Sequence, residues 1–230
     1  MLRRRKTDPG VAEDLPPRTQ HDVIVPLTDE QLSLYEALVS ESLATIRGTR
    51  GIDRSGLVFR LLGGLKQIAN HPAQYLHEID GPLAGRSGKV EAAVELVRSA
   101  VDGDEQVLVF SQYVQMCEIA RRRLAELDVD AAVLHGALSS TARDELVRRF
   151  QAGELRVLIV SLKAGGTGLN LTAATQVVHV DRWWNPAVED QATDRAWRIG
   201  QTRPVVVHRF ISEGTIDERI AEMIARKRQL

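Results

Sequence analysis

The 230-residue chain lacks the features that mark several classes of protein. Its single cysteine, Cys117, has no partner for a disulfide or a zinc site, so we expect a reducing compartment and a thiol buried in the core. No apolar run approaches the length of a membrane span, and the basic start Met1–Lys6 lacks the apolar segment of a secretory signal. These absences predict a cytoplasmic protein with no membrane partner.

The chain also lacks an excess of either charge. Lys and Arg total 30 against 31 for Asp and Glu, which excludes a basic tail or a histone-like coat. Any contact with nucleic acid must therefore come from local placement of charge. The 43% of hydrophobic residues is enough for a sizeable core. The basic residues are nearly all arginine, a usage typical of a GC-rich genome, and this indicates a bacterial source.

The chain divides into four expected segments. Residues 1–27 are mostly polar and carry several prolines, so we interpret them as a connector from something upstream. Residues 28–86 predict a helical extension, 87–213 a core, and 214–230 a C-terminal helix opened by a capping box at Thr215. Within the first two segments, a short strand is expected at 23–25 and helices at 28–47 and 57–70.

From residue 87 the pattern alternates between helix and strand. Short all-apolar strands between amphipathic helices predict an α/β fold, with a parallel sheet covered on both faces. The expected strands are 106–111, 131–134, 157–161, 176–181 and 205–211. The expected helices between them are 87–101, 114–127, 141–151 and 186–198.

Polar residues follow the expected strands, where ligands gather in an open α/β sheet. A glycine-rich segment at 162–170 lets backbone amides approach an anion, and Lys163 adds charge, although a simple tight turn explains the glycines equally well. The other residues at this edge are Ser111, Gln112, Tyr113, His135, Gly136, Arg182, Trp183 and Trp184.

Two arginines stand out in the run Asp194–Gln201. Arg195 and Arg198 are spaced i and i+3, so on a continuous helix they share one face at the mouth of the sheet. Two planar cations side by side repel each other unless an anion lies between them, and phosphate is the natural candidate. A solvated helix surface is the alternative for an arginine pair taken alone.

The sequence lacks the other half of a nucleotide site. Ser87-Gly88-Lys89 resembles the end of a phosphate-binding loop, but Leu83 and Val90 break the required pattern. No strand ends in paired acidic residues that could hold magnesium, and Asp144-Glu145 is interpreted as a solvated helix face. We therefore expect no metal site here, and neither ATP nor Mg²⁺ bound by this chain alone.

The motifs, taken together, resemble a known family. Residues 161–170, 181–186 and 191–201 are similar to motifs five and six of the Swi/Snf-type DNA-translocating ATPases, a branch of the superfamily-two helicase-like proteins. Further co-linear similarities are at 2–6, 14–16, 31–35, 65–72, 87–89 and 107–113. The resemblance implies a RecA-like fold and the second lobe of a two-lobed motor. The phosphate loop and the acidic Mg²⁺ ligands then belong to a first lobe.

The resemblance also implies residue roles at the nucleotide. ATP with Mg²⁺ lies between the lobes, and Arg195 and Arg198 match arginine fingers that stabilise charge on the transferred phosphoryl group. Gln191 and Asp194 match positions that orient these arginines and sense the nucleotide. Gly166 and Gly168 match the motif that joins the ATP cleft to the DNA track.

For DNA, the resemblance implies contacts to the sugar-phosphate backbone that fix position without reading sequence. His135 has an equally good interpretation as a satisfied turn residue, and core packing is preferred for Trp183. Trp197 departs from the histidine or tyrosine often found at its position. The candidate contacts are Ser111, Gln112, His135, Gly136, Lys163, Thr167 and Trp184.

The leading hypothesis is therefore one lobe of an ATP-dependent translocase on double-stranded DNA. Its expected partners are the first lobe, duplex DNA, and RNA polymerase or another DNA-bound protein that it displaces. Two alternatives remain: a strand-separating helicase of another superfamily-two branch, and a non-catalytic DNA-binding or interaction module. DNA-stimulated ATP hydrolysis on adding the first lobe distinguishes these hypotheses.

Overall fold

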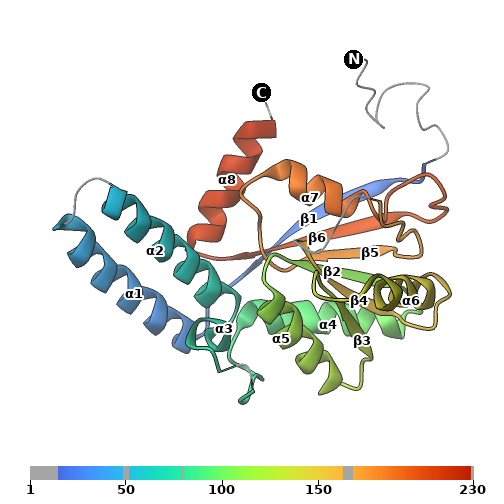
Figure 1. Ribbon diagram of the computed structural model, residues 1–230, viewed down its shortest axis with the longest axis horizontal. Helices are drawn as coiled ribbons and strands as arrows, with labels where there is room; N and C mark the ends of the chain where they lie inside the picture. The colour runs from blue at the N-terminus through green and yellow to red at the C-terminus, as the bar shows by residue number, and fades with distance from the viewer. Residues whose placement is uncertain (1–14, 49–51, 79, 163–167, 229–230) are drawn as a thin grey trace.

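The computed structural model describes residues 15–48, 52–78, 80–162 and 168–228. A central sheet is covered by helices on both faces, and a helical extension projects from one side of it (Figure 1). This is the RecA-like α/β fold expected from the sequence.

The sheet has six strands, all parallel, in the order β1-β6-β5-β2-β4-β3. Strand β2 lies between β4 and β5, so the chain reverses its winding direction there. Ligands bind at the carboxyl ends of strands at such a switch point. The strands are β1 (Arg18–Val25), β2 (Val107–Ser111), β3 (Ala131–Leu134), β4 (Val157–Ser161), β5 (Gln176–His179) and β6 (Val205–Ser212).

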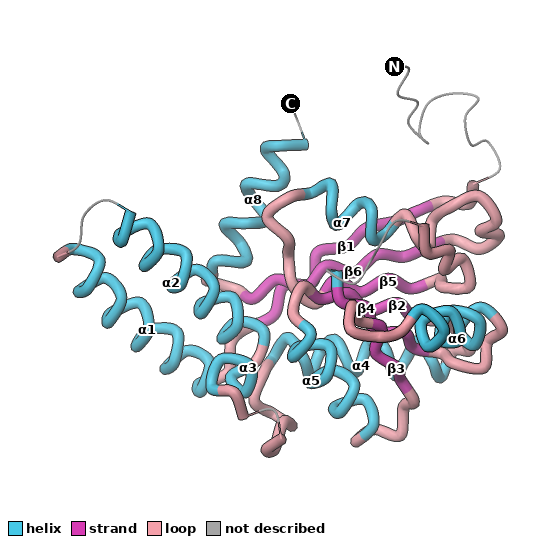
Figure 2. The backbone as a smooth tube through the Cα atoms, viewed as in Figure 1, coloured by secondary structure: helices cyan, strands magenta, loops and turns pink. Residues whose placement is uncertain are grey.

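The described part of the chain has eight helices, and Figure 2 shows α1, α2 and α3 to one side of the sheet and the others around its strands. Helices α4 and α5 cover one face, while α6 and α7 cover the other. The helices are α1 (Asp29–Arg47), α2 (Ile52–Asn70), α3 (Pro72–Leu76), α4 (Gly88–Asp102), α5 (Val114–Ala125), α6 (Ser140–Gln151), α7 (Pro186–Thr193) and α8 (Ile216–Arg228).

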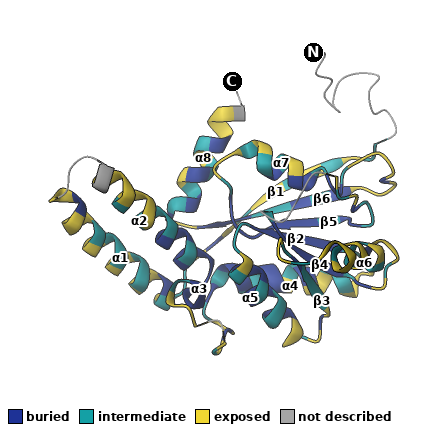
Figure 3. Cartoon of the chain, viewed as in Figure 1, coloured by how far each residue is buried: buried dark blue, intermediate teal, exposed yellow. Residues whose placement is uncertain are grey.

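Alternation along each strand builds two cores. In β2, Val107 and Val109 point to the α4–α5 face, whereas Leu108 and Phe110 point to the α6–α7 face. The central strands are therefore buried on both sides, as Figure 3 shows by their colour. Cys117 on α5 is fully buried in the first core, which confirms its expected place, and burial raises the pKa of its thiol.

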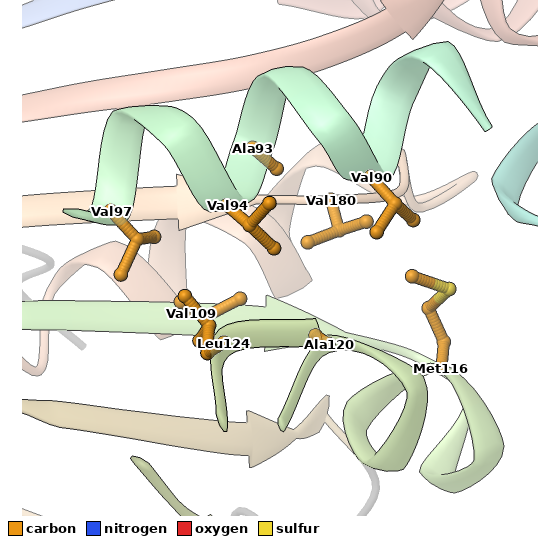
Figure 4. A pocket seen from close by; sticks show the side chains of 9 residues that line it. All are labelled: Val90, Ala93, Val94, Val97, Val109, Met116, Ala120, Leu124 and Val180. Carbon is orange, nitrogen blue, oxygen red and sulfur yellow. The ribbon is translucent and has the colours of Figure 1, made fainter. Parts of the chain in front are cut away.

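A small cavity lies within the first core, between α4, α5 and the sheet (Figure 4). Its volume is about 10 Å³, room for one water at most, and every side chain around it is apolar. This cavity is therefore part of the apolar core. The lining residues are Val90, Ala93, Val94, Val97, Val109, Met116, Ala120, Leu124 and Val180.

The helical extension consists of α1, α2 and α3, with α1 and α2 packed side by side (Figure 1). Thr28 and Gln31 form a capping box at the start of α1. The buried Gln31 side chain also donates to the carbonyls of Ile68 and Ala69, at 2.8 and 3.1 Å. These bonds fasten α1 to the end of α2, where the extension joins the sheet.

The structure corrects three expected boundaries. Strand β1 begins at Arg18, inside the segment interpreted as a connector, and it is an edge strand whose side chains are largely exposed. Its polar pattern therefore gave no strand signal. After α2, His71 caps the short helix α3, an element not among those expected from the sequence. Helix α7 ends at Thr193 instead of continuing to 198.

Within the described ranges, no helix combines the length and apolar character that crossing a lipid bilayer requires.

Candidate functional site

The carboxyl ends of β2 and β5 meet at Asp181. Its carboxylate is fully buried and accepts hydrogen bonds from the Ser111 hydroxyl and, at 3.2 Å, from the backbone N–H of Gln112. Burial raises the pKa of Asp181, and the nearby Lys66 ammonium and the Ser111 bond act against that rise. Ser111, a predicted DNA contact, is thus 1% exposed and already bound within the protein.

Two polar groups at this edge have buried atoms without a hydrogen-bond partner among the described residues. They are Nε2 of Gln112, after β2, and Oγ of Ser161, at the end of the neighbouring strand β4. Buried polar atoms normally find a partner, so this edge has hydrogen-bonding capacity that the described chain does not use.

The arginine segment differs from the expectation. Because α7 ends at Thr193, residues 194–198 form turns, and Arg195 and Arg198 do not share a helix face. Arg195 is 7% exposed, whereas Arg198 is exposed. The segment also lies away from the carboxyl edge, because the Trp197 indole donates to the Pro16 carbonyl, just before β1 begins, at 2.8 Å. As a crossover helix, α7 has carried the chain back across the sheet.

Arg195 lies over the α6–α7 face of the sheet. Its guanidinium carbon is 5.9 Å from the centre of the Phe110 ring, and that ring stacks on His179 at 5.4 Å. Burial lowers the pKa of Arg195. Its carbonyl accepts a hydrogen bond from Leu171 N at 2.9 Å. The glycine-rich connection after β4 therefore ends directly beside the arginine segment.

The other predicted nucleotide contacts are spread around this segment. Gln191 is exposed on α7, and the Asp194 carboxylate lies 3.7 Å from the Arg18 guanidinium at the sheet edge. Gly168 has a positive φ of 110°, a conformation that favours glycine. Gly166, with Lys163 and Thr167 from the predicted DNA contacts, lies outside the described residues.

His135 and Gly136 follow β3 at the carboxyl edge, as predicted. Gly136 is exposed, and the half-buried His135 accepts a hydrogen bond from Ala137 N at 3.3 Å through Nδ1. This is the bond of a satisfied turn histidine, and it leaves Nε2 available for another contact.

The three tryptophans occupy different environments. Trp184 is 37% exposed, near the carboxyl end of β5. Trp183 is half-buried and belongs to neither core, which corrects the preference for core packing. Trp197 packs on the α6–α7 core and stacks under Arg18, whose guanidinium carbon lies 4.5 Å from the ring centre.

A buried ion pair shapes the loop that carries Trp183 and Trp184. Arg182 and Glu189 are each 2% exposed and form two hydrogen bonds, of 2.9 and 3.1 Å. Glu189 also accepts from Trp183 N at 2.9 Å. Although burial favours the neutral acid, the Arg182 guanidinium holds the pKa of Glu189 below its ordinary value. Asn185 then caps α7 through Ala187 N.

Sequence reasoning missed a buried lysine near this loop. Lys66 of α2 is 1% exposed, and its ammonium donates to the carbonyl of Arg182. A lysine on the buried face of an amphipathic helix, beside Leu65, Ile68 and Ala69, was the available signal. Asp181, a buried carboxylate after an apolar strand, is the opposite charge that such a lysine needs nearby.

The false phosphate loop has a structural role. Ser87 caps α4, and the Lys89 ammonium is fully buried against Asp217 of α8. Gly88 is required by close packing, since a Cβ there would lie 2.4 Å from the Pro26 carbonyl oxygen. Among the described residues, no three His, Cys, Asp or Glu side chains gather to hold a metal ion. The Asp144-Glu145 pair lies on the exposed face of α6, as expected.

Comparisons with known proteins agree with this geometry. Residues 88–200 match the helicase conserved C-terminal domain family. The solved C-terminal domain of a Sulfolobus solfataricus SWI2/SNF2 ATPase is 37% identical with a TM-score of 0.78, covering 93% of this chain and 87% of that chain. The core of a Sulfolobus solfataricus SWI2/SNF2 ATPase in complex with dsDNA is 41% identical with a TM-score of 0.82, over 99% of this chain and 48% of that one.

A curated relative is longer than this chain. A Bacillus subtilis protein named as a candidate ATP-dependent helicase/translocase is 49% identical over 100% of this chain and 25% of its own length. The chain thus spans about a quarter of that relative. The six-stranded parallel sheet and the match to a solved SWI2/SNF2 domain over 93% of this chain point to the same family. The chain therefore belongs to the SWI2/SNF2 ATPase family, as its C-terminal RecA-like helicase domain.

Proposed function

We propose that the chain is the second motor lobe of an ATP-dependent translocase on double-stranded DNA. It supplies arginine side chains to a nucleotide held mainly by a first lobe, and it contacts the DNA backbone along the carboxyl edge of its sheet. Neither strand separation nor base reading is required of these residues.

The observation that carries the proposal is the position of the glycine-rich connection. It leaves the carboxyl edge at Ser161, and by Leu171 it is hydrogen-bonded to the backbone of Arg195. One segment thus links the edge proposed for DNA to the face proposed for ATP. A coupled motor needs such a link, since a change at the nucleotide must alter the grip on DNA.

On the nucleotide side, the exposed Arg198 is the better placed to reach a phosphate across a lobe interface. Arg195, largely covered beside Phe110, lies closer to the sheet. The described residues fit ATP only in part, because they offer cations for its phosphates and no acidic cluster for Mg²⁺. ATP bound between the lobes supplies the phosphoryl group, whose developing charge these arginines stabilise.

On the DNA side, the half-buried Gln112, the second nitrogen of His135 and the exposed ring of Trp184 lie at strand ends. A relative solved in complex with dsDNA shares 41% of residues over 99% of this chain, which supports DNA as a ligand of this lobe. Displacement of RNA polymerase or another DNA-bound protein is proposed only as a consequence of translocation.

The test compares the chain alone with the parent protein that contains both lobes. We expect DNA to stimulate ATP hydrolysis in the two-lobed protein, and the chain alone to hydrolyse ATP no faster than background. Movement is measured by displacement of a third strand from a triplex, and unwinding by release of a strand from a duplex. Turnover by the isolated lobe, or unwinding without triplex displacement, would contradict the proposal.

A further inference from the structure

Lys66 connects the helical extension to the loop that carries Trp184. It lies near the end of α2, which packs against α4 and α8, and is 1% exposed. Its ammonium donates to the Arg182 carbonyl and lies 5.5 Å from the centre of the Trp184 ring. One side chain from the extension therefore contacts both ends of the segment 182–184.

This segment has few other supports on the side of Trp184. The Arg182 side chain is held by Glu189, whereas the bond to the Trp184 carbonyl within the described residues is a long one of 3.5 Å from the ammonium of Lys227 on α8. A cation near the face of an aromatic ring is attracted to it, and the attraction grows as water is excluded. Lys66 is thus well placed to set the orientation of the exposed ring.

Burial of the Lys66 ammonium carries a desolvation cost, and nearby carboxylates offset part of that cost. Burial lowers the pKa of Lys66, while the charges of Asp181 and Asp217 act in the opposite direction. Lys89 is also close and is itself paired with Asp217. An apolar side chain would fill the same space without this desolvation cost, so packing alone does not require a lysine here.

We propose that Lys66 is a positioning residue for the DNA contact: it holds segment 182–184 so that Trp184 faces the duplex, and it makes the grip depend on the placement of α2. The proposal rests on the proposed function, because it takes Trp184 as a DNA contact. Lys66 itself is buried and touches neither DNA nor nucleotide. Through Lys66, the helical extension contacts the loop at the DNA-facing edge.

The test is a double-mutant cycle between Lys66 and Trp184 in the two-lobed parent protein. The measured quantities are the DNA concentration that half-maximally stimulates ATP hydrolysis and the maximal turnover. Lys66→Met keeps the length and removes the charge, and we expect it to raise that DNA concentration about 3- to 30-fold with maximal turnover preserved. In a Trp184→Ala background, the same substitution should add less than about twofold, because its target is gone.

Ile68→Ala is the matched control. It removes a fully buried side chain from the same helix, and so lowers stability without touching the loop contact. We expect it to leave the DNA concentration for half-maximal stimulation unchanged. The cycle is repeated with Lys66→Gln, which is neutral but keeps an N–H donor, so that the test does not depend on the folding of one variant.

Three results would overturn the proposal. The first is an equal effect of Lys66→Met with and without Trp184, and the second is an equal effect of Ile68→Ala. The third is the absence of any effect of Trp184→Ala, which would withdraw the DNA role of Trp184 and this proposal with it. The third result removes Trp184 from the DNA contacts of the proposed function, whereas the first two leave those contacts intact.

Discussion

The ammonium of Lys89 lies 2.5 Å from Oδ2 of Asp217, and both side chains are 0% exposed. The pair joins α4, which opens the sheet core, to α8, which follows the last strand. Asn70, at the end of α2, accepts a further bond from Lys89 at 3.1 Å. Helices α2, α4 and α8 therefore meet at one buried cation.

Removing this cation should destabilise the lobe strongly. Lys89→Met leaves the Asp217 carboxylate buried without its partner, and we expect a loss of about 3–5 kcal/mol in the free energy of unfolding. The double substitution Lys89→Met with Asp217→Leu should recover much of that loss. Urea unfolding curves measure both, and a double variant no more stable than Lys89→Met would contradict this account.

Arg198→Ala should reduce DNA-stimulated turnover of the two-lobed protein by about 10³- to 10⁵-fold, with little change in DNA affinity. Lys is a poor substitute for a planar guanidinium, so Arg198→Lys should recover only a small part. Arg219→Ala is the control, since this arginine is 77% exposed on α8 and pairs only with Glu222 in the described structure. A similar loss in the control would show that the effect is not specific.

Lys163→Ala should weaken DNA binding uniformly across sequences. Loss of one phosphate contact reduces the slope of log affinity against log salt by about 1. Affinity measured for two unrelated duplexes at several salt concentrations tests this. An unchanged slope would remove Lys163 from the DNA surface, and a sequence-dependent loss would indicate a base contact instead.

Two glycines should respond oppositely to alanine. Gly88→Ala brings a Cβ against the Pro26 carbonyl and should destabilise the lobe by about 1–3 kcal/mol. Gly63 lies in the middle of α2, where an added Cβ would meet no neighbouring atom within 4 Å, so Gly63→Ala should stabilise by about 0.5–1 kcal/mol. Thermal unfolding distinguishes the two, and equal shifts would contradict the packing argument.

His71 should make stability depend on pH near neutrality. Burial lowers the pKa of its ring, whose Nδ1 accepts from Ala73 N, so the folded state holds the neutral form. The unfolded state binds the proton more readily, so stability is complete above about pH 6.5 and falls as the pH drops below it. Urea midpoints between pH 8 and 5 should show this slope, reduced in His71→Asn and retained in His77→Asn.

The core was accessible to sequence reasoning because its signals are local. Val157–Ser161 and Ala131–Leu134 are strands with the predicted bounds, since short apolar runs between helices have one good interpretation. The expected C-terminal helix is also present as α8, with Ile220 and Ile224 buried. Family motifs then supplied the RecA-like identity of the lobe.

The missed features depend on distant partners. Arg18–Val25 became a strand only because β6 lies beside it, and its exposed polar side chains carry no period of their own. The prediction of a continuous helix through Arg195 and Arg198 was wrong for a different reason. Helix α7 ends at Thr193, and the hydrogen bond from Leu171 N to the Arg195 carbonyl joins that segment to a distant loop. Lys66 was overlooked because a charge on an apolar face acquires meaning only from Arg182 and Trp184 across the fold.

The pairing of β1 has a consequence for how the lobe is made. Its neighbour in the described sheet is β6, which is encoded near the opposite end of the described chain. During synthesis, β1 leaves the ribosome before the other five strands and must wait until nearly all of them have emerged before it can dock. This edge therefore assembles only after most of the lobe has emerged, and a nascent lobe halted before Val205 would leave β1 without its strand partner and open to chaperones or to self-association.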